Sequence, residues 1–342
     1  MSPAAPARPA SPSRRLDGTF VGGLNQALRY ELDNDPSLLL LGEDIAQLGG
    51  LFRVTEGLAE AHPDRVLDTP IAEAGFTGVA IGAAMAGHHV MVEMQVIDFL
   101  WLAADQLANA AGLHFASGGQ ISVPLVLRGP CGLGTGFGVT HSQRLEAVLA
   151  SRPGMKVVMP STPGDAKGLL TSALRDPGPV IMFEDSILYY RRGPLPPDGT
   201  AIPIGEAKVA REGSDVTLAT TGRGLGICLD AAQELSDDRG IEVEVIDLRS
   251  LKPLDWGMLE DSVATTRRFA IALDGPSFCS YGSYVAAEMG RRRWSMLDAP
   301  PLAITGIDVP GAPPEPAEAA VAISPEKVSQ RIASLVDGSA AG

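Results

Sequence analysis

Glu73 is the first residue in the sequence whose position favours acid–base chemistry. It lies in the string DTPIAEAGF, residues 68–76, between a short strand-like run and an almost wholly apolar helix-like run. A carboxylate at such a junction should be partly removed from water, which suits it to proton transfer. An acidic residue at a helix N-terminus, stabilised by the helix dipole, is the plainer interpretation of the same pattern.

A glycine-rich segment followed by a histidine is the second candidate. Residues 128–138 read RGPCGLGTGFG, and His141 follows in THSQ. The segment lacks the lysine and spacing of a P-loop, so it indicates a ligand-facing loop rather than a phosphate cradle. His141 could shuttle a proton, contact an anionic substrate or simply cap a helix. Ser142 is its neighbour, but no G-x-S-x-G elbow supports a serine hydrolase.

Glu43 and Phe99 are further candidates. Glu43, with Asp44, follows an apolar run at residues 38–41, and ligand sites of open α/β sheets lie beyond the carboxyl ends of strands. A solvated acidic turn is the alternative. Phe99 in DFLW could stack on a heteroaromatic ring, although core packing is the commoner role of phenylalanine.

Alternating strand and helix patterns must position these residues. In the first half we expect strands at 38–41, 89–95, 123–128, 156–159 and 180–184, and helices at 73–87, 98–116, 141–149 and 165–175. In the second half we expect strands at 216–220, 242–247, 269–273 and 302–305, and helices at 226–235, 254–264, 282–290 and 325–336. A Pro-rich loop is expected at 309–316. This order predicts α/β architecture with mostly parallel sheets.

The predicted organisation is two domains joined by a linker. Residues 191–203 read RRGPLPPDGTAIP, a composition typical of linkers. We place a disordered tail at 1–16, the first domain at 17–190, the linker at 191–205 and the second domain at 206–337. The first fifteen residues lack the apolar core of a secretory signal, and a cytoplasmic protein is expected.

Composition excludes several classes of protein. Hydrophobic residues make up 45% of the 342 residues, which favours large buried cores. The formal net charge of −14 argues against non-specific nucleic-acid binding. No apolar run is long enough for a membrane span. The three cysteines form no CxxC pair, so we expect reduced thiols and no zinc site.

The ordered set of motifs is more specific than any single one. It resembles the beta subunits of thiamine-diphosphate-dependent 2-oxo acid dehydrogenases, of the pyruvate and branched-chain types, and acetoin dehydrogenase beta subunits are similar. The resemblance covers about Phe20 to Val309. The strings that carry it are GEDIAQLGGLFRVTEGL, RVLDTPIAEAGFTGVAIGAAMAG, DQLANAA, SGGQISVPLVLRGP, THSQRLEAVLASRPGMKVVMPSTPGDAKGLL and EVIDLRSLKPLD.

The resemblance implies a fold and a set of partners. The first domain would be the pyrimidine-binding domain of the transketolase-like enzymes, and the second would resemble the transketolase C-terminal domain. Two beta chains would pair with two alpha chains, with thiamine diphosphate at the alpha–beta interface. The alpha subunit would hold the diphosphate and Mg²⁺, and this sequence has no GDG motif followed by an asparagine pair.

Roles for particular residues also follow from the resemblance. Glu73 matches the glutamate that hydrogen-bonds the aminopyrimidine ring and promotes loss of the thiazolium C2 proton. Phe99 matches the aromatic residue that stacks on the pyrimidine, and His141 the histidine that faces substrate and the incoming lipoyl group. Glu43, Ile71 and Gln95 match positions around the pyrimidine.

Two peripheral sites are implied as well. A structural K⁺ site, made mainly of backbone carbonyls, maps to Leu125, Ala173, Leu174, Asp176 and Gly178. Asp298 matches the acidic residue that helps to dock the peripheral binding domain of the acyltransferase core.

The sequence departs from the family pattern at several positions. These are Thr140, residues 273–277, the run 311–316, a missing residue near Gly112, and Gly22 with Gly23. The departures concern substrate and acyl acceptor rather than the predicted cofactor residues.

Three functions therefore remain open at this stage. The first is oxidative decarboxylation of a small, pyruvate-like 2-oxo acid with acyl transfer to lipoamide. The second is a two-subunit transketolase-like or acetoin-cleaving enzyme that acts on a ketose or related donor and passes a two-carbon unit to a carrier protein or another acceptor. The third is a non-catalytic assembly subunit.

Overall fold

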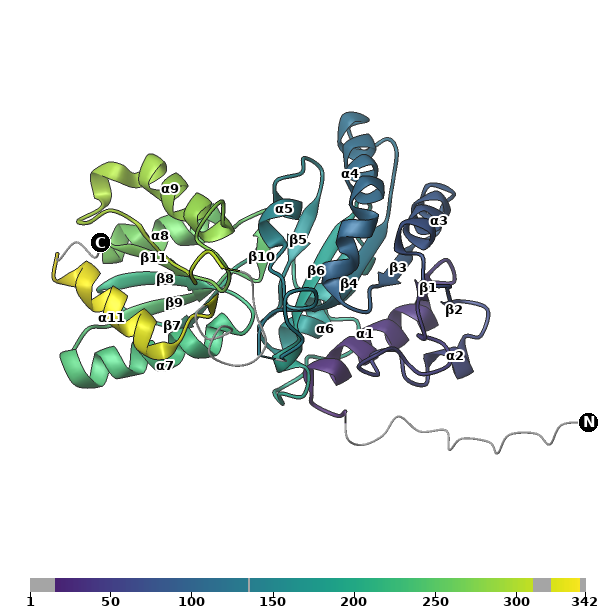
Figure 1. The fold of residues 1–342 in the computed structure, drawn as a ribbon, viewed down its shortest axis with the longest axis horizontal. Helices are drawn as coiled ribbons and strands as arrows, with labels where there is room; N and C mark the ends of the chain where they lie inside the picture. Colours follow the sequence, from purple (N-terminus) through teal and green to yellow (C-terminus); the bar gives the residue numbers. More distant parts are fainter. Residues whose placement is uncertain (1–15, 135, 310–320, 339–342) are drawn as a thin grey trace, which may run out of the picture.

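The computed structural model describes residues 16–134, 136–309 and 321–338, which form two α/β units (Figure 1). The first unit is built on a seven-stranded sheet with the order β10-β5-β6-β4-β3-β1-β2. All of its strand pairs are parallel except that between β10 and β5. Its strands are β1 (Leu39–Gly42), β2 (Val66–Asp68), β3 (Val90–Glu93), β4 (Leu125–Cys131), β5 (Lys156–Val158), β6 (Val180–Asp185) and β10 (Ser250–Lys252).

Helices cover both faces of the first sheet. In Figure 1, α3 and α4 lie over one face, and α1 and α6 lie over the other. Every residue of β4 is buried, as expected for a central strand covered on both sides. The helices of this unit are α1 (Phe20–Asn34), α2 (Leu58–Ala61), α3 (Glu73–Met85), α4 (Leu100–Ala116), α5 (Glu146–Ala150) and α6 (Pro163–Leu174), with short 3-10 turns at Ile97–Phe99 and Ser186–Leu188.

The second unit is built on a five-stranded sheet with the order β12-β11-β8-β9-β7. Its strands pair in parallel except for β7 with β9. The strands are β7 (Lys208–Arg211), β8 (Val216–Thr220), β9 (Val243–Asp247), β11 (Phe269–Ala272) and β12 (Leu302–Ile304). The helices are α7 (Gly224–Arg239), α8 (Trp256–Thr266), α9 (Tyr281–Arg293) and α11 (Pro325–Val336), with a 3-10 turn at Trp294–Met296.

The two units share more than a linker. Strand β10 belongs in sequence to the second half of the chain, but it pairs with β5 at the edge of the first sheet. Two buried hydroxyls reinforce this contact: Thr221 Oγ1 donates to the carbonyl of Met159 at 2.6 Å, and Tyr281 Oη donates to that of Leu251 at 2.5 Å. The second unit therefore completes the sheet of the first.

The predicted α/β class with mostly parallel sheets is confirmed, whereas some elements differ from expectation. The helix expected from residue 141 begins only at Glu146, because Gln143 and Arg144 are held by contacts with distant residues. The sequence reasoning missed α1, although its buried residues recur at every fourth position, from Phe20 to Leu32. It also missed the short strands β7 and β10.

At the start of α1, close packing explains why glycine occupies positions 22 and 23, where the sequence departs from the family pattern. A Cβ atom at Gly22 would lie 1.9 Å from the carbonyl oxygen of Leu16, and one at Gly23 would lie 2.7 Å from that of Pro163. Neither backbone oxygen could give way cheaply, so close packing of α1 requires glycine at both positions.

Two expectations fall outside the described residues: the disordered tail, apart from its last residue, Leu16, and most of the Pro-rich loop at 309–316. Among the helices that are described, none has the length and apolar character needed to cross a membrane.

Candidate active site

The predicted cofactor residues meet at one edge of the first sheet. Strands β2, β1, β3 and β4 are adjacent and parallel, so their carboxyl ends lie side by side. Each of these ends is followed by a predicted residue: Glu73 after β2, Glu43 after β1, Gln95 and Phe99 after β3, and His141 after β4. Residues far apart in sequence therefore converge where open α/β sheets bind ligands.

Glu73 and Glu43 form the acidic part of this edge. Glu73 is the first residue of α3 and is only 8% exposed, as the sequence predicts. Its carboxylate has no hydrogen-bond partner among the described residues. Burial raises the pKa of Glu43, and the negative charges of Glu73 and Asp44 raise it further. Gln95 Nε2 donates to the backbone carbonyl of Glu43 at 3.3 Å, which ties β3 to β1 at this point.

Aromatic rings gather around His141. The half-buried ring of Phe99 lies edge-on to the imidazole, with 5.3 Å between centroids and an interplanar angle of 76°. Phe137, from the glycine-rich segment, approaches the same imidazole at 6.4 Å. Thr140 Oγ1 lies 2.7 Å from His141 Nδ1, so the hydroxyl can fix the ring. The stacking candidate and the proton-shuttle candidate are thus neighbours.

Asp98 belongs to this neighbourhood but was not singled out from the sequence. Its Oδ1 accepts a hydrogen bond from the backbone N–H of Gln143 at 3.0 Å, and its Oδ2 is buried without a partner among the described residues. Burial raises the pKa of Asp98, while the N–H of Gln143 and the nearby His141 act in the opposite direction.

A buried charge cluster links the central strands β3, β4 and β6. The guanidinium of Arg128 pairs with both Glu93 and Glu184, and Tyr189 Oη donates to Glu184 at 2.6 Å. Burial raises the pKa of Glu93, and Arg128 opposes that shift. A fully buried ion-pair network fixes geometry more than it adds stability, so this cluster rigidifies β3, β4 and β6 at the edge that carries the site.

Several large apolar side chains near the carboxyl edge of the first sheet are exposed. Ile71 is 83% exposed, and Val79 and Phe115 are each 65% exposed on the outer faces of α3 and α4. Trp101 and Leu102 are also largely exposed. Exposed apolar side chains on α3 and α4 make this side of the edge a candidate interaction surface.

The predicted K⁺ residues are brought near one another by α6 and β4. Leu125 begins β4, Ala173 and Leu174 end α6, and Asp176 and Gly178 follow in the turn. Asp176 Oδ1 accepts the N–H of Gly178 at 2.9 Å, and the ammonium of Lys156 pairs with Oδ2. The Asp176 carboxylate is therefore already neutralised, which leaves carbonyl oxygens as the remaining hard ligands.

Asp298 lies on the second unit, far along the chain from the other candidates. Its carboxylate is partly exposed and pairs with Arg267 at 2.7 Å. The hydrogen bond from Arg267 lowers the pKa of Asp298, so the group is an anion on the surface.

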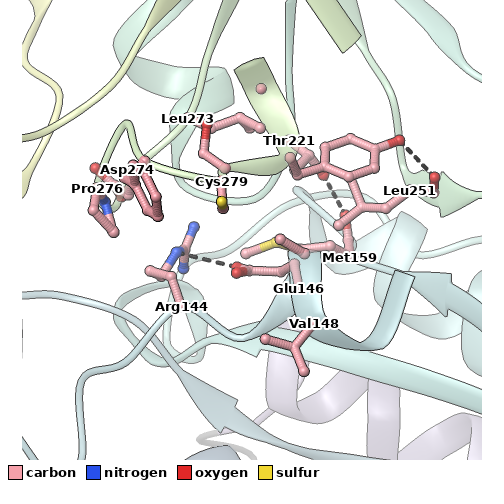
Figure 2. A pocket seen from close by; sticks show the side chains of 15 residues that line it. Arg144, Glu146, Val148, Met159, Thr221, Leu251, Leu273, Asp274, Pro276 and Cys279 are labelled. Carbon is pink, nitrogen blue, oxygen red and sulfur yellow. Dashed lines mark hydrogen bonds and ion pairs between the residues drawn. The ribbon is translucent and has the colours of Figure 1, made fainter. Parts of the chain in front are cut away.

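A cavity of about 210 Å³ lies between the two units (Figure 2). Arg144 and Glu146 of the first unit face Asp274, Pro276 and Cys279 of the second across it. The residues that line it include none of the predicted cofactor residues. The cavity is thus a feature of the domain interface.

Comparison with protein families matches both units. The model of the transketolase pyrimidine binding domain matches residues 19–191, and that of the transketolase C-terminal domain matches residues 205–328. Among solved structures, the inactive beta4 tetramer of a split-gene transketolase superposes with a TM-score of 0.76 at 21% identity, covering 93% of this chain and 98% of that one. At that identity the likeness shows the fold alone.

Curated relatives are more similar in sequence. The mitochondrial pyruvate dehydrogenase E1 component subunit beta of Caenorhabditis elegans is 40% identical over 335 residues, which is 95% of each chain. Subunit beta-1 of the same component from Arabidopsis thaliana is 42% identical and covers 85% of this chain and 82% of the relative. The 2-oxoisovalerate dehydrogenase subunit beta of Bacillus subtilis is 39% identical and covers 93% and 98%.

Proposed function

We propose that this chain, which belongs to the family of beta subunits of thiamine-diphosphate-dependent 2-oxo acid dehydrogenases, carries the pyrimidine side of an active site for oxidative decarboxylation. The substrate would be a small, pyruvate-like 2-oxo acid, and the acyl group would pass to lipoamide. The observation that carries the proposal is Glu73: a residue only 8% exposed, whose carboxylate lies near that of Glu43 and has no hydrogen-bond partner among the described residues.

The residues at this edge fit the aminopyrimidine ring of thiamine diphosphate. Glu73 offers a carboxylate oxygen for a ring nitrogen, and its missing partner is what such a ligand would supply. Phe99 offers a half-buried aromatic face. Glu43, Ile71 and Gln95 would surround the ring, with Ile71 contributing apolar surface that is otherwise exposed to water.

The chain's own residues would hold and move protons around that ring. When bound, thiamine diphosphate supplies the electron sink that decarboxylation of a 2-oxo acid requires. Glu73 would share a proton with the pyrimidine nitrogen, Phe99 would exclude water from one face, and His141 would exchange a proton with the substrate or the incoming lipoyl group. Because the rings of Phe99 and His141 are in edge-on contact, the residue that would cover the pyrimidine lies beside the residue that would exchange the proton.

A partner is needed to close the site. We infer that an alpha subunit covers the exposed apolar faces of α3 and α4, that it holds the diphosphate and Mg²⁺, and that two alpha and two beta chains assemble together. The exposure of Ile71, Val79 and Phe115 supports this inference, because surfaces of this kind are seldom left in water.

Two peripheral proposals accompany the active site. A K⁺ ion held by carbonyls among Leu125, Ala173, Leu174, Asp176 and Gly178 would stiffen the turn after α6; replacing K⁺ by choline should then lower the melting temperature.

Asp298 would contact the peripheral binding domain of a lipoyl acyltransferase core. Because Asp298 is already paired with the exposed Arg267, a docking partner would compete with Arg267 for its carboxylate.

Glu73→Gln tests the function directly. The variant, assembled with its alpha subunit, should bind thiamine diphosphate but lose 2-oxo acid decarboxylation measured with an artificial electron acceptor. Glu60→Gln, at an exposed glutamate of α2, is the matched control and should keep full activity. Normal decarboxylation by Glu73→Gln would refute the assignment.

A further inference from the structure

The ion pair between Arg144 and Asp185 lies at the domain interface, next to the segment that carries His141. Arg144 is three residues beyond His141, and its side chain is only 7% exposed. Its Nη1 donates to Asp185 Oδ1 at 2.7 Å, and its Nε lies 3.1 Å from Glu146 Oε1. Asp185 is the last residue of β6 and is fully buried. Figure 2 shows the Arg144 guanidinium at the interface, beside Glu146.

The second domain holds the same carboxylate from its other side. The backbone N–H of Arg223, immediately before α7, donates to Asp185 Oδ2 at 2.7 Å. The guanidinium of Arg223 pairs in turn with Asp274, which also accepts the N–H of Ile323 at 2.9 Å. The two oxygens of Asp185 are therefore divided between the domains, one for Arg144 and one for Arg223.

Two glycines make room for this carboxylate. Gly132, from the first domain, has φ +90°, and a Cβ there would lie 2.4 Å from Asp185 Oδ1. Gly222, from the second domain, has φ +59°, and a Cβ there would lie 2.1 Å from Asp185 Oδ2. A third glycine, Gly275, packs against the stem of Arg144, since its Cβ would lie 3.2 Å from Arg144 Cβ. Side chains at these positions would displace the ion pair.

The His141 segment is held at a second point by the neighbouring residue. Gln143 donates its backbone N–H to Asp98 at 3.0 Å, and its side-chain oxygen accepts from Trp101 Nε1 at 2.9 Å. Residues 139–145 form no regular element, so these side-chain contacts are what fix them. Gln143 anchors the segment to α4, and Arg144 anchors it to β6 and the second domain.

We propose that Arg144 and Asp185 are positioning residues for His141, and that the second domain maintains their pairing through the backbone N–H of Arg223. The proposal rests on the proposed function in one respect only, which is the role of His141 in acyl transfer. It assigns the second domain a part in positioning an active-site residue. Arg144 aligns the segment that presents His141 to the acyl acceptor.

The proposal predicts a local loosening that proteolysis can detect. Phe137 is exposed and lies two residues before the held segment 139–145, so chymotrypsin can cleave after it when that segment moves. Arg144→Met should raise the rate of that cleavage about tenfold in the full chain. The double variant Arg144→Met/Asp185→Asn removes both charges, which avoids an unpaired buried carboxylate and keeps the test available where the single variant fails to fold.

The matched control is Arg249→Met. Arg249 also forms a buried ion pair across the domain interface, with Asp165 at 3.1 Å, but it does not contact the glycine-rich segment. It should change cleavage after Phe137 by less than about twofold. Equal acceleration in Arg249→Met, or no acceleration in either Arg144 variant, would overturn the proposal. Arg144→Lys, which keeps the charge, should restore most of the protection.

Activity gives a second, separable measurement. In the assembled enzyme, Arg144→Met should lower acyl transfer to lipoamide about tenfold or more while decarboxylation with an artificial electron acceptor changes by less than about threefold. Equal losses in both would show that the ion pair supports decarboxylation as much as acyl transfer, which would overturn its assignment to the transfer step. An inactive wild-type assembly would refute the proposed function instead, and the proteolysis result would still decide the role of the ion pair.

Discussion

Glu43 and Glu73 place two carboxylates near one another at the carboxyl edge of the first sheet. Burial raises the pKa of Glu43, and the charge of Glu73 adds to that effect. A second carboxylate nearby makes the carboxyl of Glu43 hold its proton more readily than burial alone would. The acidic edge is thus suited to sharing a proton with a ring nitrogen.

The pairing predicts a measurable change at Glu43. Glu73→Gln removes the neighbouring charge, so the pKa of Glu43 should fall, although burial keeps it above its ordinary value. Carbon NMR of isotope-labelled glutamate, titrated in both proteins, measures this pKa. An unchanged Glu43 titration would mean that the two carboxylates do not interact.

Phe99 should contribute to cofactor affinity through its ring. Phe99→Leu keeps most of the apolar volume but removes the aromatic face, and we expect thiamine diphosphate to bind the assembled enzyme about tenfold more weakly. Phe99→Tyr keeps the face and is the matched comparison. Calorimetric titration of both variants distinguishes stacking from simple packing, because only Phe99→Leu should lose affinity.

The isolated chain should bind little thiamine diphosphate. The site residues lie at an open edge, with Ile71 83% exposed, so under the proposed function the rest of the enclosure comes from the alpha subunit. Calorimetry should detect no saturable heat for the isolated chain and clear binding once the alpha subunit is added. Tight binding by the chain alone would contradict a divided site.

The buried carboxyl of Asp247 should make the free energy of unfolding depend on pH. Burial, together with the charge of Asp165, raises the pKa of Asp247 to about 7, despite the hydrogen bond from Ser161 Oγ at 2.7 Å. An unfolded aspartate has a pKa of about 3.9. Between about pH 4 and 7 the folded state therefore binds more protons, and this group makes the unfolding free energy fall as pH rises.

Urea denaturation across this pH range measures that contribution. Asp247→Asn should flatten the decline, because the variant has no carboxyl to deprotonate. Asp230→Asn, at an exposed residue of α7, is the control and should leave the decline as it is in the wild type. A decline that persists in Asp247→Asn would show that other groups cause it.

Asp298→Ala should weaken docking of the acyltransferase's peripheral binding domain about fivefold, because a surface anion is lost from the contact. Asp337→Ala removes a similarly exposed anion, which pairs with Arg239 at 3.0 Å, and should leave affinity unchanged. Surface plasmon resonance measures both. Equal affinities for wild type and Asp298→Ala would point to another acyl acceptor.

Some of this could be predicted from the sequence. Glu73, Glu43, Phe99 and His141 each follow a strand pattern, and parallel strands bring their carboxyl ends to one edge, so convergence was predictable. The contribution of Asp98 was not, because an aspartate beside an apolar run has no local signature of a buried hydrogen bond to a residue 45 positions away.

The contacts between the domains were likewise invisible in the sequence. Arg144 and Asp185 are 41 residues apart, and their pairing depends on the loop geometry at Gly132 and Gly222 rather than on any periodic pattern. Strand β10 contains only three residues, between β9 and α8, which is too short for a strand pattern to be recognised. Tertiary contacts of this kind override local preference.

The position of β10 makes the two domains inseparable in practice. A fragment ending in the linker would leave the backbone groups along one side of β5 without their partner strand, and such an open edge recruits strands from other molecules. Shortening the gene at the linker should therefore yield an aggregating product rather than a free domain. We therefore expect the first domain to fold only when the chain extends from α1 through β10 at least.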